Sequence, residues 1–292
     1  MSRFTHLLVG PWPHGMARPE RGSDIPPTAL FDAVNVDVRP EGSVATARGW
    51  EQVLAAANCH SMYYHRGTVY GVVDGQLSVL SESGAQALMP VSGALSWTDV
   101  GGVAHFATRD AVWRVREGVC TQVSTANRDP DDFDDALAPL PGGQWLEYWN
   151  GRLLVARGAV LVFSQPLRYG TYNPMTDYIA LGRQIEWVAP LETGIYVGTI
   201  DKVYWIDGTQ PSEFRVREVA GKSAPGMAAV VPAEALGRSG AARYAVFFTP
   251  SGFAVGDASG AIEHPQAERF ADLPLYRGKL FVENTRIFAV RA

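Results

Sequence analysis

The stretch Val69-Tyr-Gly-Val-Val-Asp-Gly-Gln-Leu-Ser-Val-Leu80 decides the fold of this chain. Its two apolar runs flank Asp74-Gly75, a dipeptide typical of the two-residue turn of a β-hairpin. The same phrase returns five times, starting 35 to 50 residues after the previous one, at 105–115, 153–163, 195–206, 245–255 and 280–290. A hairpin that returns at this spacing is typical of β-propeller blades. The sequence therefore predicts an all-β propeller of about six blades of antiparallel strands.

The N-terminal region does not fit this repeat. Prolines in Gly10-Pro-Trp-Pro-His-Gly15 and Ile25-Pro-Pro27 remove backbone donors and interrupt regular structure, so we predict an extended proline-rich arm over residues 1–32. Residues 33–38 then alternate apolar and polar side chains, residues 39–42 supply a turn, and residues 43–50 lead back, which predicts a hairpin within 33–53. The end of the chain supplies too few strands for a full blade. We therefore expect the hairpin at 33–53 to help close the last blade of a propeller over 33–292.

The bulk composition narrows the class of protein. The chain has 292 residues, 47% of them hydrophobic, and a formal net charge of −5 without any basic run. This charge gives no support to specific nucleic-acid binding. No stretch of 18 apolar residues and no signal-peptide core occur, so we expect no membrane association. Cys59 and Cys120 fall in different blades and are expected to be buried, reduced thiols, which favours assembly in a reducing cytoplasm.

Three carboxylates precede hairpins at positions where an innermost strand should line the propeller axis. They are Asp99, Glu147 and Glu186, and indole side chains flank them at Trp97, Trp145, Trp149 and Trp187. A glycosidase needs two such carboxylates, one as acid and one as nucleophile or base, with aromatic rings that stack on a sugar. The acids do not share one register, however, and acids in a wet channel are common without catalysis. These residues therefore support only an alternative hypothesis, a propeller glycosidase or carbohydrate-binding module.

No other pattern in the sequence indicates chemistry. The acidic loop at 127–135 lacks the central glycine and terminal glutamate of a calcium loop, so we expect no metal site. The six histidines are scattered singly, and neither a nucleophile elbow nor a phosphate-binding glycine loop occurs. We expect no catalytic residues and no cofactor, and hence a protein that is not an enzyme.

The stretch from Ala33 to Trp50 resembles the opening of virion proteins of tailed bacteriophages, of the neck, tail-hub and tail-stabilisation β-propeller type. The resemblance rests on Asn35, Asp37, Gly42, Arg48 and Gly49. It implies a non-enzymatic structural protein of the neck, tail hub or nozzle, which is assembled in the host cytoplasm and resides in the virion. It further implies contacts with portal, adaptor or tail components, and a ring-forming homo-oligomer. A weaker alternative is a cytoplasmic interaction scaffold.

Contact residues are expected in the arm and in two long insertions, because long loops on a compact scaffold often carry function. The insertions are residues 127–143 and 165–174, and Tyr178 follows the second. The arm residues expected to bind a partner are Trp12, Pro13, Ile25 and Phe31, and the expected loop contacts are Phe133, Tyr169, Tyr172 and Tyr178.

Overall fold

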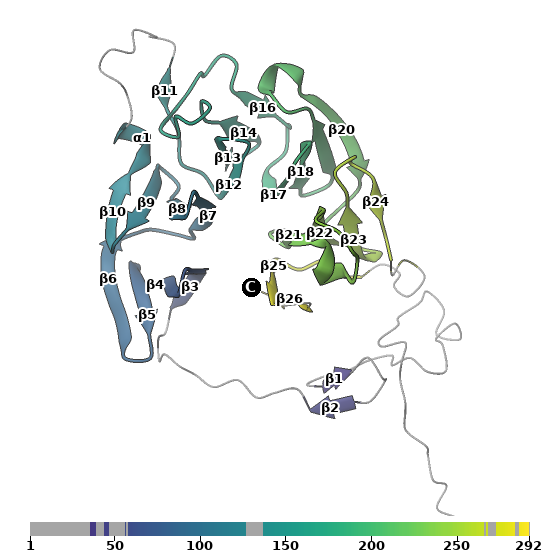
Figure 1. Ribbon diagram of the computed structural model, residues 1–292, viewed down its shortest axis with the longest axis horizontal. Coiled ribbons are helices and arrows are strands. Elements are labelled where there is room, and N and C mark those ends of the chain that lie inside the picture. Colours follow the sequence, from purple (N-terminus) through teal and green to yellow (C-terminus); the bar gives the residue numbers. More distant parts are fainter. Residues whose placement is uncertain are drawn as a thin grey trace, which may run out of the picture.

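A computed structural model describes residues 36–38, 44–46, 56, 58–126, 137–265, 267, 273–283 and 286–291. Within these residues the chain forms five four-stranded antiparallel sheets arranged around a common axis, and a β-propeller results (Figure 1). We number these sheets as blades 1 to 5 in chain order. The predicted fold class, an all-β propeller of antiparallel strands, is confirmed, whereas the expected count of about six blades stays a prediction.

Each blade runs from an innermost strand beside the axis to an outermost strand at the rim. Blade 1 contains β3 (Cys59–His65), β4 (Thr68–Val73), β5 (Gln76–Ser81) and β6 (Gly84–Pro90). Blade 2 contains β7 (Ser96–Val100), β8 (Val103–Ala107), β9 (Val112–Arg116) and β10 (Val119–Gln122), with the four-residue helix α1 (Val123–Ala126) at its end.

The next three blades follow the same order. Blade 3 contains β12 (Trp145–Trp149), β13 (Arg152–Arg157), β14 (Val160–Phe163) and β16 (Tyr178–Ala180). Blade 4 contains β17 (Ile185–Leu191), β18 (Gly194–Thr199), β19 (Val203–Asp207) and β20 (Arg215–Ala220). Blade 5 contains β21 (Ala228–Pro232), β22 (Arg243–Thr249), β23 (Gly252–Gly256) and β24 (Ile262–Glu263). Short 3₁₀ turns cover Pro211–Glu213 and Ala233–Leu236.

The repeated phrase forms the two middle strands in each of these five blades. The last phrase differs, because it forms β25 (Gly278–Glu283) and β26 (Arg286–Arg291), and β25 lies beside β21, the innermost strand of blade 5. The final hairpin therefore occupies the inner half of a sector (Figure 1). Among the described strands it forms a two-stranded sheet of its own.

Within the hairpin predicted at 33–53, β1 (Val36–Val38) and β2 (Val44–Thr46) pair antiparallel. Among the described strands it too forms a separate two-stranded sheet. Its expected participation in the last blade therefore stays a prediction. The predicted arm at 1–32 lies outside the described residues.

The core fills the spaces between neighbouring blades. Its largest fully buried side chains include Trp187 of β17, Tyr196 of β18 and Trp205 of β19, and Phe247 of blade 5 packs 5.0 Å from Trp187 between ring centroids. In blade 4 both faces of the inner strands are covered, so β17 and β18 are buried along their whole length. This dense packing gives the inner strands a fixed position around the axis.

The two cysteines are unpaired, as expected. Cys120 is partly buried, but the predicted burial of Cys59 is wrong, because this residue opens the first strand of blade 1 and is exposed.

Candidate functional site

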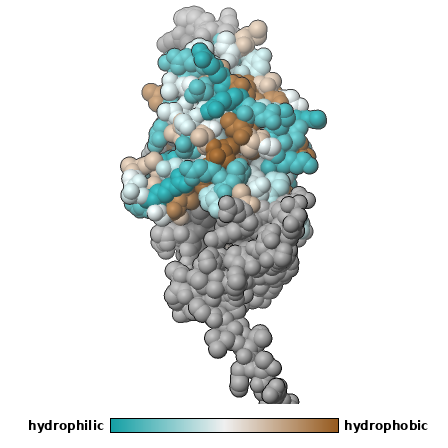
Figure 2. Space-filling model, turned by 90° about the vertical axis from the view of Figure 1, so that its right-hand side faces the viewer, coloured by the Kyte–Doolittle hydropathy of each residue, from teal (hydrophilic) through white to brown (hydrophobic). Residues whose placement is uncertain are grey.

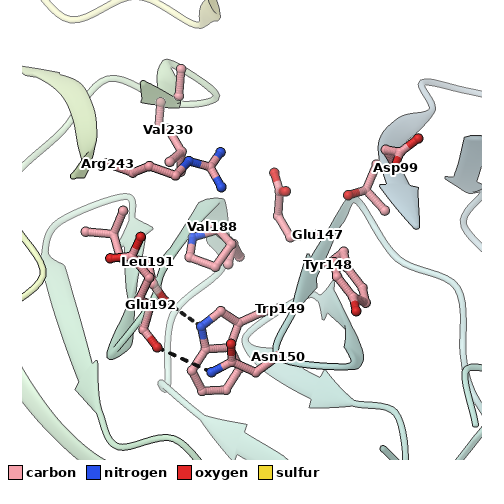
Figure 3. A pocket seen from close by; sticks show the side chains of 14 residues that line it. Asp99, Glu147, Tyr148, Trp149, Asn150, Val188, Leu191, Glu192, Val230 and Arg243 are labelled. Atoms are coloured by element: carbon pink, nitrogen blue, oxygen red, sulfur yellow. Dashed lines mark hydrogen bonds between the residues drawn. The ribbon is translucent and has the colours of Figure 1, made fainter. Parts of the chain in front are cut away.

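A cavity of about 520 Å³ lies on the propeller axis, bounded by the inner strands of blades 2 to 5 (Figure 3). It brings together carboxylates from two blades, because Asp99 on β7 and Glu147 on β12 both line it. The Arg243 guanidinium and the Glu147 carboxyl project into the same space from opposite sides (Figure 3). The polar and aromatic part of the lining is completed by Thr98, Tyr148, Trp149, Asn150 and Glu192.

The Asp99 carboxylate is held in its ionised form. Its Oδ2 lies 2.6 Å from Nε2 of His65 on β3, and its Oδ1 accepts a hydrogen bond of 2.9 Å from the Gly102 backbone N–H. Burial alone would raise the pKa of Asp99, but the Gly102 N–H and His65 together lower it below its usual value. Asp99 therefore carries a negative charge at neutral pH and joins the inner strands of blades 1 and 2.

The Glu147 carboxyl has the opposite character. Protein surrounds it, and it keeps partial exposure only toward the cavity. Burial raises the pKa of Glu147 to about 8, although a hydrogen bond of 3.1 Å from Trp145 Nε1 and the charges of Lys279 and Arg243 act in the other direction. At neutral pH this carboxyl is therefore mainly protonated and can donate a proton.

Glu186 has a different role from the other two acids. It lies on β17, an innermost strand as expected, but it does not line the axial cavity. Its side chain is buried, and its Oε2 lies 2.6 Å from a guanidinium nitrogen of Arg277, just before β25. The sequence hypothesis placed three acids in one funnel, and the structure brings two of them together.

Cations around the axis come from the blades opposite the acids. Nζ of Lys279, on β25, lies 3.9 Å from the centre of the Trp145 ring, an arrangement that favours a cation–π interaction. Burial lowers the pKa of Lys279, and the Glu147 charge partly restores it. Sequence reasoning missed Arg243, Lys279 and His65 as neighbours of the acids. Of these three residues, only Lys279 had a recognisable position in the sequence, because it directly precedes the apolar run of the last repeat.

The second insertion is ordered and attached to blade 3. Its β15 (Thr171–Tyr172) pairs with β11 (Ala138–Pro139). The buried Asp177 accepts hydrogen bonds from the Gln165 side-chain amide and from the Asn173 backbone N–H at 2.8 Å. The loop is therefore clamped at both ends by one carboxylate.

The tyrosines predicted as loop contacts divide into two kinds. Tyr169 and Tyr172 are half-buried and pack against the core between blades 2 and 3, whereas Tyr178 on β16 is exposed. Phe133 lies outside the described residues, as do the predicted arm contacts Trp12, Pro13, Ile25 and Phe31. Whether any of these residues binds a partner stays a prediction.

A search of the described residues finds no group of three or more His, Cys, Asp or Glu side chains that could hold a metal ion. Over the same residues, no helix has the length and apolar character needed to cross a bilayer. The expectations of no metal site and of no membrane association stay predictions.

No family model matches this chain, and no curated protein matches it. Solved structures match its fold at low sequence identity. The extracellular domain assigned to a hybrid two-component system from B. thetaiotaomicron is 10% identical over 82% of this chain, with a TM-score of 0.53. The N-terminal domain of Nup159 is 11% identical over 80% of this chain and 73% of its own length, with a TM-score of 0.50.

These similarities concern architecture. The chain spans only 33% of the length of the two-component extracellular domain. A gluconolactonase from Xanthomonas campestris is also similar, at 10% identity over 77% of this chain and 79% of its own, with a TM-score of 0.48. At identities near 10%, these similarities show the fold alone.

Proposed function

We propose that this chain is a non-enzymatic structural protein of a tailed-phage virion, which works in the neck, tail hub or nozzle through protein–protein contacts. The resemblance at residues 33–50 and the rigid propeller support this proposal. The observation that carries it is the ordered insertion on blade 3, which exposes large apolar side chains while hydrogen bonds to the buried Asp177 hold its two ends.

This insertion has the properties of a docking surface. Leu167 is 73% exposed and Met175 is 79% exposed, and Tyr178 follows on β16. Leu167 also adopts a φ of +58°, a left-handed conformation that is unfavourable for a bulky residue. A clamped loop loses little conformational entropy when it binds, and exposed apolar groups supply the area that binding buries. On the coloured part of the face that Figure 2 shows, apolar groups are interspersed with hydrophilic ones.

The test uses the tailed phage that encodes the chain, with its gene inactivated and variants supplied from a plasmid. The wild-type chain should be found by mass spectrometry in purified particles, and Met175→Asp should reduce its incorporation at least several-fold. Ile200→Asp is the matched control, because Ile200 is an exposed apolar residue on blade 4 and should be tolerated. Absence of the wild-type chain from particles would refute the proposal. So would gene neighbours unrelated to portal, capsid or tail proteins.

A second candidate function rests on the axial cavity. Asp99 and Glu147 line one space, and their environments shift their pKa values in opposite directions, the arrangement that separates an acid from a base or nucleophile. We propose glycoside hydrolysis or carbohydrate binding as this alternative. A panel of aryl glycosides tests it. Turnover by the wild-type chain that Glu147→Gln and Asp99→Asn each abolish, and that Glu82→Gln in an exposed turn leaves unchanged, would replace the non-enzymatic proposal.

A further inference from the structure

Two half-blades remain among the described strands. Each of the five complete blades has four strands, whereas β25–β26 and β1–β2 form two-stranded sheets. Because β25 lies in the inner ring, β26 is the second strand of its sector, and its outer edge has no ladder partner in the part of the chain that the structure describes. An unpaired strand edge presents free N–H and C=O groups that readily accept another strand.

The path of the chain assigns β1 and β2 to the two vacant positions. In blades 1 to 5 the outermost strand leads to the innermost strand of the next sheet, as β6 leads to β7. The same rule requires the strand before β3 to be the outermost strand of the preceding sector, and that strand is β2. Seen down the axis, β25, β26, β1 and β2 follow one another outward in the sector between blade 5 and blade 1 (Figure 1).

Blade 1 has an apolar face directed toward this sector. Its other face packs on blade 2 through Tyr63 and Trp97, whose rings stack 5.1 Å apart. On the free face, Met62 is 68% exposed and Tyr64 is 70% exposed, although both lie on the innermost strand. Inner strands of a propeller are covered on both faces when a neighbouring blade is complete, as β17 is.

The hairpin has a composition that fits this space. Its register sets Val36 opposite Thr46 and Val38 opposite Val44. In its sequence, Val36-Asp37-Val38 alternates apolar and polar residues, the pattern of a strand that covers an apolar surface on one side.

We propose that β1 pairs antiparallel with the free edge of β26, so that β25, β26, β1 and β2 form a sixth four-stranded blade. This blade covers the free face of blade 1 and closes the ring. It also fixes β25, which carries Lys279 to the face of the Trp145 ring. The partner of the blade 1 face is therefore a segment of the same chain.

Cysteine cross-linking in the full chain tests the pairing. In a background with Cys59→Ser and Cys120→Ser, Ala289→Cys on β26 is combined in turn with Val36→Cys, Asp37→Cys or Val38→Cys on β1. Adjacent strands lie about 4.8 Å apart, within the reach of a disulfide, whereas alternate strands lie about 10 Å apart. Mild oxidation should therefore join Ala289→Cys to at least one β1 position within a single chain. The matched control is Ala45→Cys on β2, which should form at least tenfold less disulfide.

Three results would overturn the proposal: no disulfide to any β1 position, equal disulfide to Ala45→Cys, or a disulfide that links two copies of the chain. Hydrogen exchange of the unmodified chain gives an independent readout that needs no variant. As a central strand, β26 should show protection of consecutive amides. As an edge strand it would show protection of alternate amides only, which would also contradict the proposal.

Discussion

A guanidinium nitrogen of Arg277 lies 2.6 Å from the Glu186 carboxylate, although the two residues are 91 positions apart in the chain. The Glu186 side chain is 6% exposed, whereas that of Arg277 is 60% exposed. The carboxylate is thus the member of the pair that has lost its water, and Arg277 is the cation that compensates it. This contact joins the segment that leads into β25 to the inner strand of blade 4.

Replacing Arg277 by methionine should therefore destabilise the propeller. Arg277→Met leaves a buried carboxylate without its partner, and we expect a loss of about 1–2 kcal/mol after allowance for screening at the exposed arginine. Urea denaturation at pH 7 measures it. The matched control is Lys202→Met, which breaks a pair of the same 2.6 Å length between Lys202 and Glu218, both well exposed. It should cost distinctly less, and equal losses would show that Glu186 does not depend on Arg277.

Glu147 should make the protein less stable as the pH rises. Its pKa of about 8 in the folded protein exceeds the value of 4.5 for a free side chain, so between these values the folded state binds a proton that the unfolded state has lost. The free energy of unfolding then falls as the pH rises. Each unit of pKa difference corresponds to about 1.4 kcal/mol, so the total loss is up to a few kcal/mol.

The variant Glu147→Gln, which cannot ionise, should remove this dependence. It should resemble the wild type at pH 5 and be more stable at pH 8.5, as measured by urea unfolding at both values. Asp99 does not interfere, because its lowered pKa confines its effect to acid pH below about 4. Glu82→Gln, in an exposed turn, should show no such difference. An unchanged pH profile in Glu147→Gln would show that the carboxyl is already ionised at pH 7.

Variants at Leu167 should distinguish the effect of this residue on stability from its effect on docking. Its left-handed backbone is better suited to glycine, so Leu167→Gly should stabilise the fold by about 0.5–1 kcal/mol. Leu167→Ala keeps the unfavourable backbone and should give no gain. Both variants remove the exposed side chain, so both should lower incorporation into particles. Thermal unfolding and particle composition measure the two effects, and a stability loss in the glycine variant would contradict the argument.

The spacing of the repeated hairpin was sufficient to predict most of the fold, because hairpins are specified by local sequence. Hairpins need turn residues such as Asp74-Gly75 and alternating side chains, and both are local properties that a sequence displays. The position of a hairpin within its blade depends on distant packing. The last phrase therefore reads like the other five but forms an inner pair of strands, because β25 contacts β21.

The sequence predicted which acidic residues lie at the axial site, but it did not predict the residues that contact them. Inner strands precede each hairpin, so Asp99 and Glu147 could be placed near the axis from the sequence. The pKa of Asp99 is lowered by the Gly102 N–H, three residues away, and by His65 of blade 1, whereas burial raises the pKa of Glu147. The contribution of another blade, such as that of His65, has no signature in the local sequence. Glu186 pairs instead with Arg277, which is 91 positions away in the chain and equally absent from the local pattern.

Gly198 of β18 tests how far the packing between blades fixes the inner strands. A Cβ at this position would lie 2.0 Å from Cε2 of Trp187, a fully buried ring, so the indole or the backbone would have to move. Overpacking of a dense core costs about 1–3 kcal/mol, and Gly198→Ala should lose that much by urea denaturation. Gly221→Ala is the control, because a Cβ there meets nothing within 4 Å. If both variants were equally stable, the ring of Trp187 would have room to shift, and the axial strands would be less rigidly held than their burial indicates.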